Sequence, residues 1–84
     1  MLNIKEYTDR RKMIANELKV KMDGKYFYYD TSQIGLDSKG FCIINDIIYD
    51  IHTDKFMVII IDIDTRYVLL IDRCCIYLKE VYIE

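Results

Sequence analysis

The sequence has no proline and no tryptophan, and only three glycines, one histidine and one alanine among its 84 residues. The scarcity of proline and glycine, beside a hydrophobic content of 52%, argues against a disordered chain. This length is near the size at which a single hydrophobic core outweighs the entropy of the unfolded chain. We therefore expect residues 1–84 to form one small domain.

Cysteine and histidine are too few, and wrongly spaced, for the common zinc sites. Cys42 is isolated, Cys74 and Cys75 are adjacent, and His52 is the only histidine, so neither a CxxC…CxxC nor a CxxC…HxxxH spacing is present. Gly35 and Gly40 lie outside any glycine-rich phosphate loop. The sequence predicts no metal, no cofactor and no nucleotide site, and it predicts reduced cysteines in a cytoplasmic protein.

Long apolar runs are also missing. The longest, from Phe56 to Ile61, is far shorter than the roughly 20 residues that a bilayer requires. Lys5, Glu6 and Asp9 occupy the region where a secretory signal would be apolar. We expect neither a signal peptide nor an association with a membrane.

Charge is divided unevenly along the chain, although the net charge is only −2. Residues 1–36 carry a net charge of +2 and residues 37–84 carry −4. Nonspecific binding of phosphates needs clustered Lys and Arg, so the second part is a poor nucleic-acid surface. Many isoleucine and tyrosine codons are AT-rich, and this composition indicates a low-GC genome or its mobile elements.

A helix is predicted over residues 4–15. Asn3 and Glu6 have the spacing of a capping box, in which each side chain satisfies a free amide group at the start of a helix. Apolar positions then recur at intervals of three and four, which indicates one packed helical face. The residues of this stripe are Ile4, Tyr7, Arg11, Ile14 and Leu18.

The end of that helix has two interpretations. Residues 18–22 alternate with period two, and Asp23 and Gly24 form a dipeptide that is typical of type I′ hairpin turns. We therefore predict strands at 17–22 and 25–30. In the alternative, the helix continues to Met22 and Gly24 forms its cap.

A sheet is predicted for the rest of the chain, after a mobile loop at 31–40 that contains two of the three glycines. Strands are expected at 41–52, 55–64, 66–72 and 74–83. Counting outward from turns at 53–54 and 64–65 assigns Ile43 and Ile60 to a core face. The opposite face has an apolar centre that a helix is predicted to cover, formed by Ile48, Ile59, Ile61, Val68 and Leu70.

The predicted fold class is α+β, with an N-terminal helix packed on a highly twisted antiparallel β-meander of five or six strands. The nearly uninterrupted apolar run from Phe56 to Ile61 requires cover on both faces of the sheet. The sheet therefore either curls into a small barrel or stays open and is covered by a second copy of the chain.

Acidic residues are the remaining candidates for chemistry. Asp50 and Asp72 share a predicted face with Asp46, but they lie two strands apart, about 10 Å at about 4.8 Å per strand, which is too wide for one shared cation. The only histidine, His52, falls in a turn without a nucleophile beside it. We predict structural or solubility roles for these acids and a protein that is not an enzyme.

Protein binding is the function that this inventory favours. The chain is predicted to be a non-catalytic inhibitor or accessory protein of phage or mobile-element type that acts on a larger host protein. Tyrosine supplies a large contact area, and acidic residues orient the approach of a partner. The predicted binding surface consists of Tyr26, Tyr28, Asp30, Asp46, Asp50 and Asp72.

Two alternatives stay open. In the predicted hairpin, Lys19 lies opposite Tyr28 and Lys21 opposite Tyr26, a pairing that stabilises a hairpin and is also suited to stacking bases. A homodimeric structural subunit is the second alternative, because the predicted strand at 74–83 is largely apolar and lies at an edge. The nucleic-acid-binding regulator would use the basic residues Arg10, Arg11, Lys12, Lys19 and Lys21.

Overall fold

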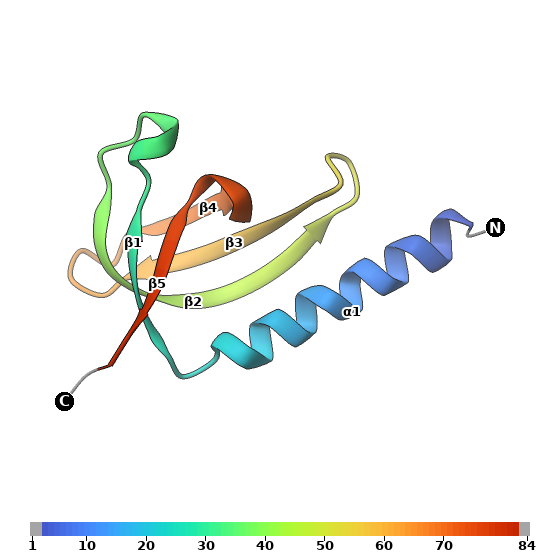
Figure 1. Cartoon of the computed structure of the whole chain (residues 1–84), viewed down its shortest axis with the longest axis horizontal. Helices are drawn as coiled ribbons and strands as arrows, with labels where there is room; N and C mark the ends of the chain where they lie inside the picture. The colour runs from blue at the N-terminus through green and yellow to red at the C-terminus, as the bar shows by residue number, and fades with distance from the viewer. Residues whose placement is uncertain (1–2, 83–84) are drawn as a thin grey trace.

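The computed structural model describes residues 3–82, which contain one α-helix and one sheet (Figure 1). All strands pair antiparallel, in the order β4-β3-β2-β1-β5, so the predicted fold class is confirmed. The sheet is not closed into a barrel, because β4 and β5 are its two edges. The elements are α1 (Ile4–Met22), β1 (Tyr26–Asp30), β2 (Lys39–Asp50), β3 (Lys55–Asp62), β4 (Val68–Asp72) and β5 (Tyr77–Val81), with short 3-10 helices η1 (Ser32–Ile34) and η2 (Arg73–Cys75).

Helix α1 starts where the sequence predicts and ends seven residues later than residue 15, at Met22. The Asn3 side chain accepts a hydrogen bond of 2.8 Å from the amide of Glu6. Ala15 is buried in the core, and Leu18 and Met22 pack against it from the same helical face. The predicted strand at 17–22 is therefore wrong, and the alternative in which the helix continues to Met22 is confirmed.

The predicted hairpin is excluded by the sheet as well. Strand β1 pairs with β2 on one side and with β5 on the other, so no edge of β1 is left for residues 17–22. The Asp23-Gly24 turn joins a helix to a strand instead of joining two strands, and Gly24 adopts a φ of +70° that is easy for glycine.

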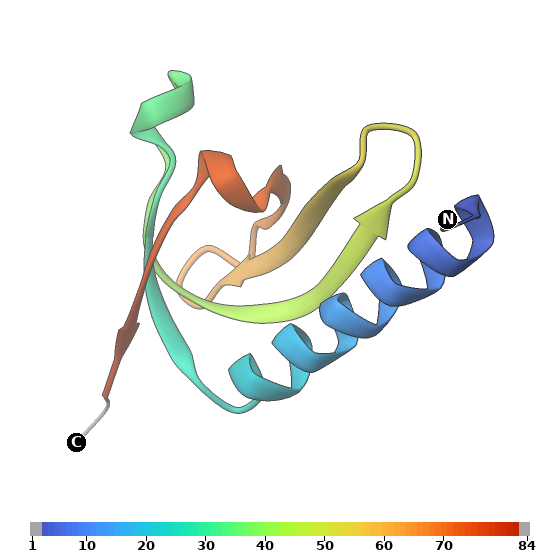
Figure 2. The same ribbon diagram turned by 45° about the vertical axis from the view of Figure 1, so that its right-hand side comes forward.

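Strand β2 is long and bent, and it connects the two halves of the sheet (Figure 2). Its first part pairs with β1, and its register with β3 shifts between Ile44 and Asp46. The extra residue of this β-bulge, Asn45, reverses the direction of the side chains that precede it. Ile43 consequently faces away from the core, and its prediction as a core residue is wrong.

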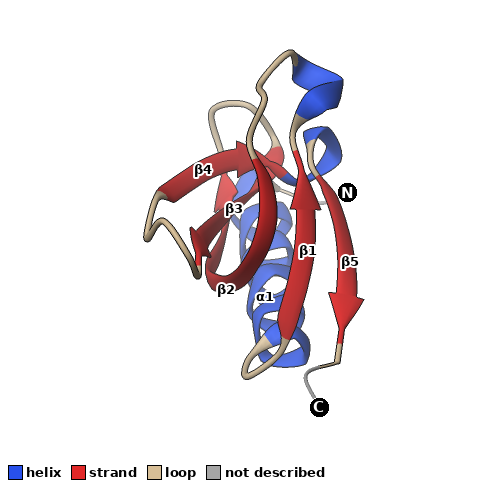
Figure 3. Cartoon of the chain, turned by 90° about the vertical axis from the view of Figure 1, so that its left-hand side faces the viewer, coloured by secondary structure: helices blue, strands red, loops and turns tan. Residues whose placement is uncertain are grey.

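Strand β5 does not follow β4 in space. From β4 the chain passes through η2 to the opposite edge of the sheet, where β5 pairs with β1 (Figure 3). The Asp72 side chain caps η2 by accepting a hydrogen bond of 2.9 Å from the amide of Cys74. The predicted strand at 74–83 is thus shortened at its start by η2, and its last predicted residue, 83, lies outside the described residues.

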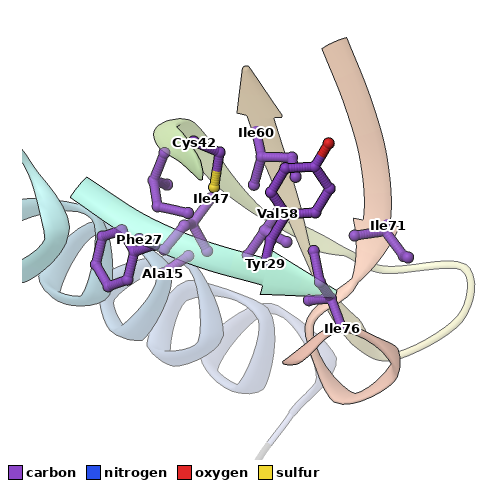
Figure 4. Packing of buried hydrophobic residues seen from close by; sticks show 10 residues of the cluster. Ala15, Phe27, Tyr29, Cys42, Ile47, Val58, Ile60, Ile71 and Ile76 are labelled. Carbon is purple, nitrogen blue, oxygen red and sulfur yellow. The ribbon is translucent and has the colours of Figure 1, made fainter. Parts of the chain in front are cut away.

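The two faces of the sheet differ sharply in burial. One face, here called the inner face, contributes Val58 and Ile60, which are fully buried, to the core (Figure 4). Helix α1 contacts β2 and adds Ala15 to this same core. The prediction that the helix covers the face with Ile59 and Ile61 is therefore wrong. Strand β1 pairs only with the first part of β2, and α1 packs beside the second part.

The loop at 31–40 is anchored at its base. Thr31 is fully buried, its hydroxyl group donates a hydrogen bond of 2.8 Å to the carbonyl group of Ser38, and its amide donates one of 3.1 Å to the same oxygen. Strand β2 begins inside the predicted loop, at Lys39. The mobility of the segment stays a prediction.

Among the described residues, no helix has both the length and the apolar character that crossing a membrane requires.

Candidate functional site

The outer face of the sheet, opposite the inner face, exposes more apolar side chains than a protein surface usually does. Strand pairing places a continuous set of apolar side chains on this face, and every one of them is exposed or half-buried. Soluble proteins seldom expose a large contiguous apolar patch unless it serves binding. The set consists of Tyr26, Tyr28, Phe41, Ile43, Ile48, Met57, Ile59, Ile61, Val68, Leu70, Tyr77 and Val81.

One end of this face is aromatic. The ring centroid of Tyr28 lies 5.9 Å from that of Phe41 and 6.4 Å from that of Tyr77, with both pairs edge-to-face. Phe41 is 46% exposed and Tyr77 is 47% exposed, so these rings are held in place by one another and still face solvent. We call Tyr28, Phe41 and Tyr77 the aromatic cluster.

The other end is aliphatic. Val68 lies opposite Ile61, and Leu70 lies opposite Ile59, across β3 and β4. Val68 and Leu70 are 61% and 59% exposed, respectively, although both belong to a regular strand. The sequence identifies this aliphatic patch correctly and covers it with the wrong element.

All six residues that the sequence predicts for a protein-binding surface lie at outer-face positions. Tyr26 and Tyr28 contribute to the apolar surface directly. Asp30 and Asp50 instead stabilise turns. Asp30 accepts a hydrogen bond of 2.8 Å from the amide of Ser32, and Asp50 accepts one of 2.9 Å from the hydroxyl group of Thr53. These hydrogen bonds lower the pKa of both carboxyl groups.

The other two acids of the predicted surface form local ion pairs. The Asp46 carboxylate lies 3.3 Å from the ammonium group of Lys19, and this ion pair connects β2 to α1. Asp72 lies 3.2 Å from the ammonium group of Lys55, and its hydrogen bond from the Cys74 amide is the main cause of a lowered pKa. Each of the four acids thus has a local hydrogen-bond or ion-pair partner.

The basic residues of the alternative nucleic-acid surface do not interleave with the tyrosines. Lys19 and Lys21 lie on the last turns of α1, whereas Tyr26 and Tyr28 lie on the outer face of β1. The predicted Lys–Tyr hairpin is therefore wrong. Arg10 and Lys12 are exposed on α1.

Arg11 belongs to a cluster around Asp54 that the sequence analysis missed. Asp54 accepts hydrogen bonds of 2.8 Å from the hydroxyl group of Tyr7 and 2.6 Å from that of Tyr49, and Arg11 approaches it to 3.8 Å. The guanidinium carbon of Arg11 also lies 5.2 Å from the ring centroids of Tyr7 and Phe56. The cluster connects the first half of α1 to the turn between β2 and β3.

The hydrogen bonds of this cluster shift the pKa values of Tyr49 and Asp54 away from their ordinary values. The bond to Asp54 raises the pKa of Tyr49 to about 12, and the bonds from Tyr49 and then Tyr7 lower the pKa of Asp54. The only sequence signal for the cluster was the position of Tyr7 and Arg11 on one helical face, which had no visible partner in the turn.

A second polar cluster is buried. The Asp62 carboxylate accepts a hydrogen bond of 2.7 Å from the Tyr29 hydroxyl group and one of 2.9 Å from the Thr65 amide. Burial raises the pKa of the neighbouring Cys42 thiol to about 12, so the group stays protonated at neutral pH. Among residues 3–82, no group of three His, Cys, Asp or Glu side chains is placed to hold a metal ion.

Phe41 and Tyr77 are the functional candidates that sequence reasoning missed. Both were included in predicted strands. The bulge in β2 and the crossing of β5 to β1 bring them beside Tyr28, and neither feature has a strong local signal in the sequence.

Comparison of the chain with protein-family models, with curated proteins and with solved structures finds no match.

Proposed function

We propose that this chain is a non-catalytic protein-binding module, an inhibitory or accessory protein that docks on a larger protein through the aromatic cluster of its outer face. One observation carries the proposal: a continuous set of apolar side chains crosses the outer face, and none of these described residues is buried. Leaving such a surface in water is costly, at about 25 cal/mol for each Å² of apolar area that a partner would cover.

The composition of the cluster suits a protein partner. Aromatic rings, tyrosine above all, dominate the energetically important residues of protein interfaces because they bury much area and lose few rotamers. Tyr28 is already held between Phe41 and Tyr77, so little further ordering is needed on binding. A partner with a complementary apolar surface fits this cluster.

Nucleic acid is the less favoured ligand for the same surface. Lys79 lies opposite Tyr28 on the outer face, and Lys39 lies opposite Asp30 at the same end, so two cations flank the edge-to-face rings. Two lysines contribute little, because affinity for a phosphate backbone grows with the number of cations that contact it. The chain as a whole carries a net charge of −2.

Co-purification from cells that naturally contain the chain tests the proposal. A tagged chain is expected to retain one stoichiometric protein partner, and Phe41→Asp should lose it while keeping the fold, because Phe41 is on the surface. Val20→Asp is the matched control, since Val20 is an exposed apolar residue of α1. The phage or mobile-element setting stays a prediction.

Two results would contradict the proposal. One is a partner that binds Phe41→Asp as strongly as the wild-type chain. The other is submicromolar binding of single-stranded nucleic acid at physiological salt without any protein partner, which would promote Lys79 and the tyrosines to a base-stacking surface.

A further inference from the structure

The two edges of the sheet are protected to different degrees. Exposed edge strands invite pairing with another chain, and proteins usually block them with charges, proline or a bulge. Strand β5 has Lys79 and Glu80 in its interior. Strand β4 has four apolar residues in succession, Val68 to Ile71, and its register with β3 is regular. The unprotected edge is β4.

The backbone of β4 is arranged to accept another strand. The Asp62 amide donates a hydrogen bond of 2.9 Å to the carbonyl group of Tyr67. Bonded and non-bonded pairs alternate in an antiparallel ladder, so Leu69 is directed to β3 in the same way as Tyr67. Val68 and Leu70 therefore turn their amide and carbonyl groups toward the open edge.

We propose that two copies of this chain pair through β4, antiparallel and about a twofold axis at Leu69. In this register Val68 lies opposite Leu70 of the partner subunit, and Arg66 lies beside Asp72 of the partner subunit. Shifting the axis to Leu70 would instead set Val68 against Asp72 of the partner subunit, an apolar group against an acid. The twofold arrangement repeats each contact, as an isologous interface requires.

Charge complementarity supports this register. Arg66 is exposed and has no ion pair within residues 3–82. Asp72 is partly buried at the end of β4 and paired with Lys55 of β3, so Arg66 of the partner subunit would be its second cation. The pairing would give two identical Arg66–Asp72 contacts, one on each side of the axis. It also joins the aliphatic patches of both copies, which shields Val68 and Leu70 from water on one flank.

This inference does not depend on the proposed function. The aromatic cluster lies toward the opposite edge of the sheet, where β1 pairs with β5. A dimer formed through β4 therefore leaves Tyr28, Phe41 and Tyr77 accessible to a different protein. Phe41→Asp should leave the dimer intact, and variants at the β4 edge should leave partner binding to the aromatic cluster intact.

Sedimentation equilibrium of the purified full chain, from about 1 to about 500 μM, tests the dimer. The mass should rise from 10.1 kDa to twice that value. Leu70→Lys should weaken dimerisation at least about tenfold by placing like charges at the interface, and Arg66→Glu should do so by opposing Asp72. Val20→Lys and Arg10→Glu, both on the exposed side of α1, are the matched controls and should dimerise normally.

Isotope-filtered NMR on a mixture of labelled and unlabelled wild-type chains gives a second readout that no variant can compromise. Contacts between Val68 and Leu70 of the partner subunit are expected. A single-chain mass at about 500 μM, an assembly larger than two chains, intermolecular contacts from Tyr77 in place of Leu70, or equal weakening by the control variants would overturn the proposal.

Discussion

The hydroxyl group of Tyr29 donates a hydrogen bond of 2.7 Å to Asp62 across the interior of the sheet. Tyr29 is in β1 and Asp62 is at the end of β3, so the bond passes over β2, which separates these strands. Gly40 makes room for it, because a Cβ atom at that position would lie 3.1 Å from the Asp62 carboxylate. Asp62 also holds the turn between β3 and β4 through the amides of Asp64 and Thr65.

Removing the Tyr29 hydroxyl group should destabilise the fold. Tyr29→Phe leaves the buried Asp62 carboxylate with one fewer donor, which typically costs about 1–3 kcal/mol. Urea unfolding followed by circular dichroism measures the loss. Tyr67→Phe is the matched control, because Tyr67 is 72% exposed, and a loss as large in the control would show that the buried bond is not the cause.

The stability of the chain should fall in acid. Hydrogen bonds from the Thr65 amide and the Tyr29 hydroxyl group lower the pKa of Asp62. A carboxyl group whose pKa is lower in the folded chain stabilises the fold above its unfolded pKa of about 4, and this stabilisation is lost as the pH falls through the folded pKa. Urea midpoints at pH 7, 4 and 2.5 should decrease in that order. The urea midpoint of Asp62→Asn should decrease less over this pH range than that of the wild-type chain. An equal decrease in the two chains would contradict the assignment.

The parts of the fold that the sequence predicts correctly depend on local patterns that tertiary contacts do not reverse. The Asn3 cap is one example. The register of β3 on β4 is another, since Ile61 lies opposite Val68 as counting from the turn at 64–65 requires. The turn between β2 and β3 is two residues longer than expected, with Asp50 opposite Lys55. Because the shift is even, the side chains between this turn and the bulge at Asn45 stay on their predicted faces.

The parts that failed depend on competition between distant segments. The alternation of Leu18, Val20 and Met22 is compatible with a strand, but the helix gains more because Leu18 and Met22 pack against the core beside Ala15. The bulge at Asn45 has no strong sequence signal, and it is why Ile43 was placed on the wrong face. The crossing of β5 to β1, which creates the aromatic cluster, is likewise decided by packing.

Core packing predicts a large effect at Ile60, which is fully buried between the strands. Ile60→Ala should cost about 2–5 kcal/mol, from lost transfer energy and the cavity that remains. Denaturant titration measures this loss, which would be a large part of the stability of a domain of this size. Leu36→Ala, at an exposed loop position, should cost less than about 1 kcal/mol. Similar losses at the two sites would mean that the inner face is not the core.

The Asp54 cluster should control the attachment of the first half of α1. Asparagine tolerates a positive φ such as the +54° that Asp54 adopts, so Asp54→Asn keeps the turn while weakening the bonds from Tyr7 and Tyr49. Hydrogen exchange should then become faster in the first half of α1 and stay unchanged near Leu18, which packs against the core. Asp9→Asn, at an exposed helix position, serves as the control. Uniformly faster exchange along α1 would indicate global destabilisation instead.

The outer face predicts an order of effects on binding to a protein partner. Tyr28 is the centre of the aromatic cluster, in contact with Phe41 and Tyr77, and truncating a central aromatic residue typically costs about 2 kcal/mol or more of binding energy. Asp50 lies at the rim and is engaged with Thr53, so Asp50→Asn should change affinity by less than about 1 kcal/mol.

Isothermal titration with the partner recovered by co-purification measures both affinities. Thermal unfolding of each variant serves as the control for folding, and neither change should unfold the chain, since Tyr28 is only half-buried and Asp50 lies beside a turn. A larger loss of affinity for Asp50→Asn than for Tyr28→Ala would move the docking surface from the aromatic cluster to the acidic rim. In that case raising the salt concentration should also weaken binding strongly, because exposed charges are screened within about 10 Å at 0.1 M salt.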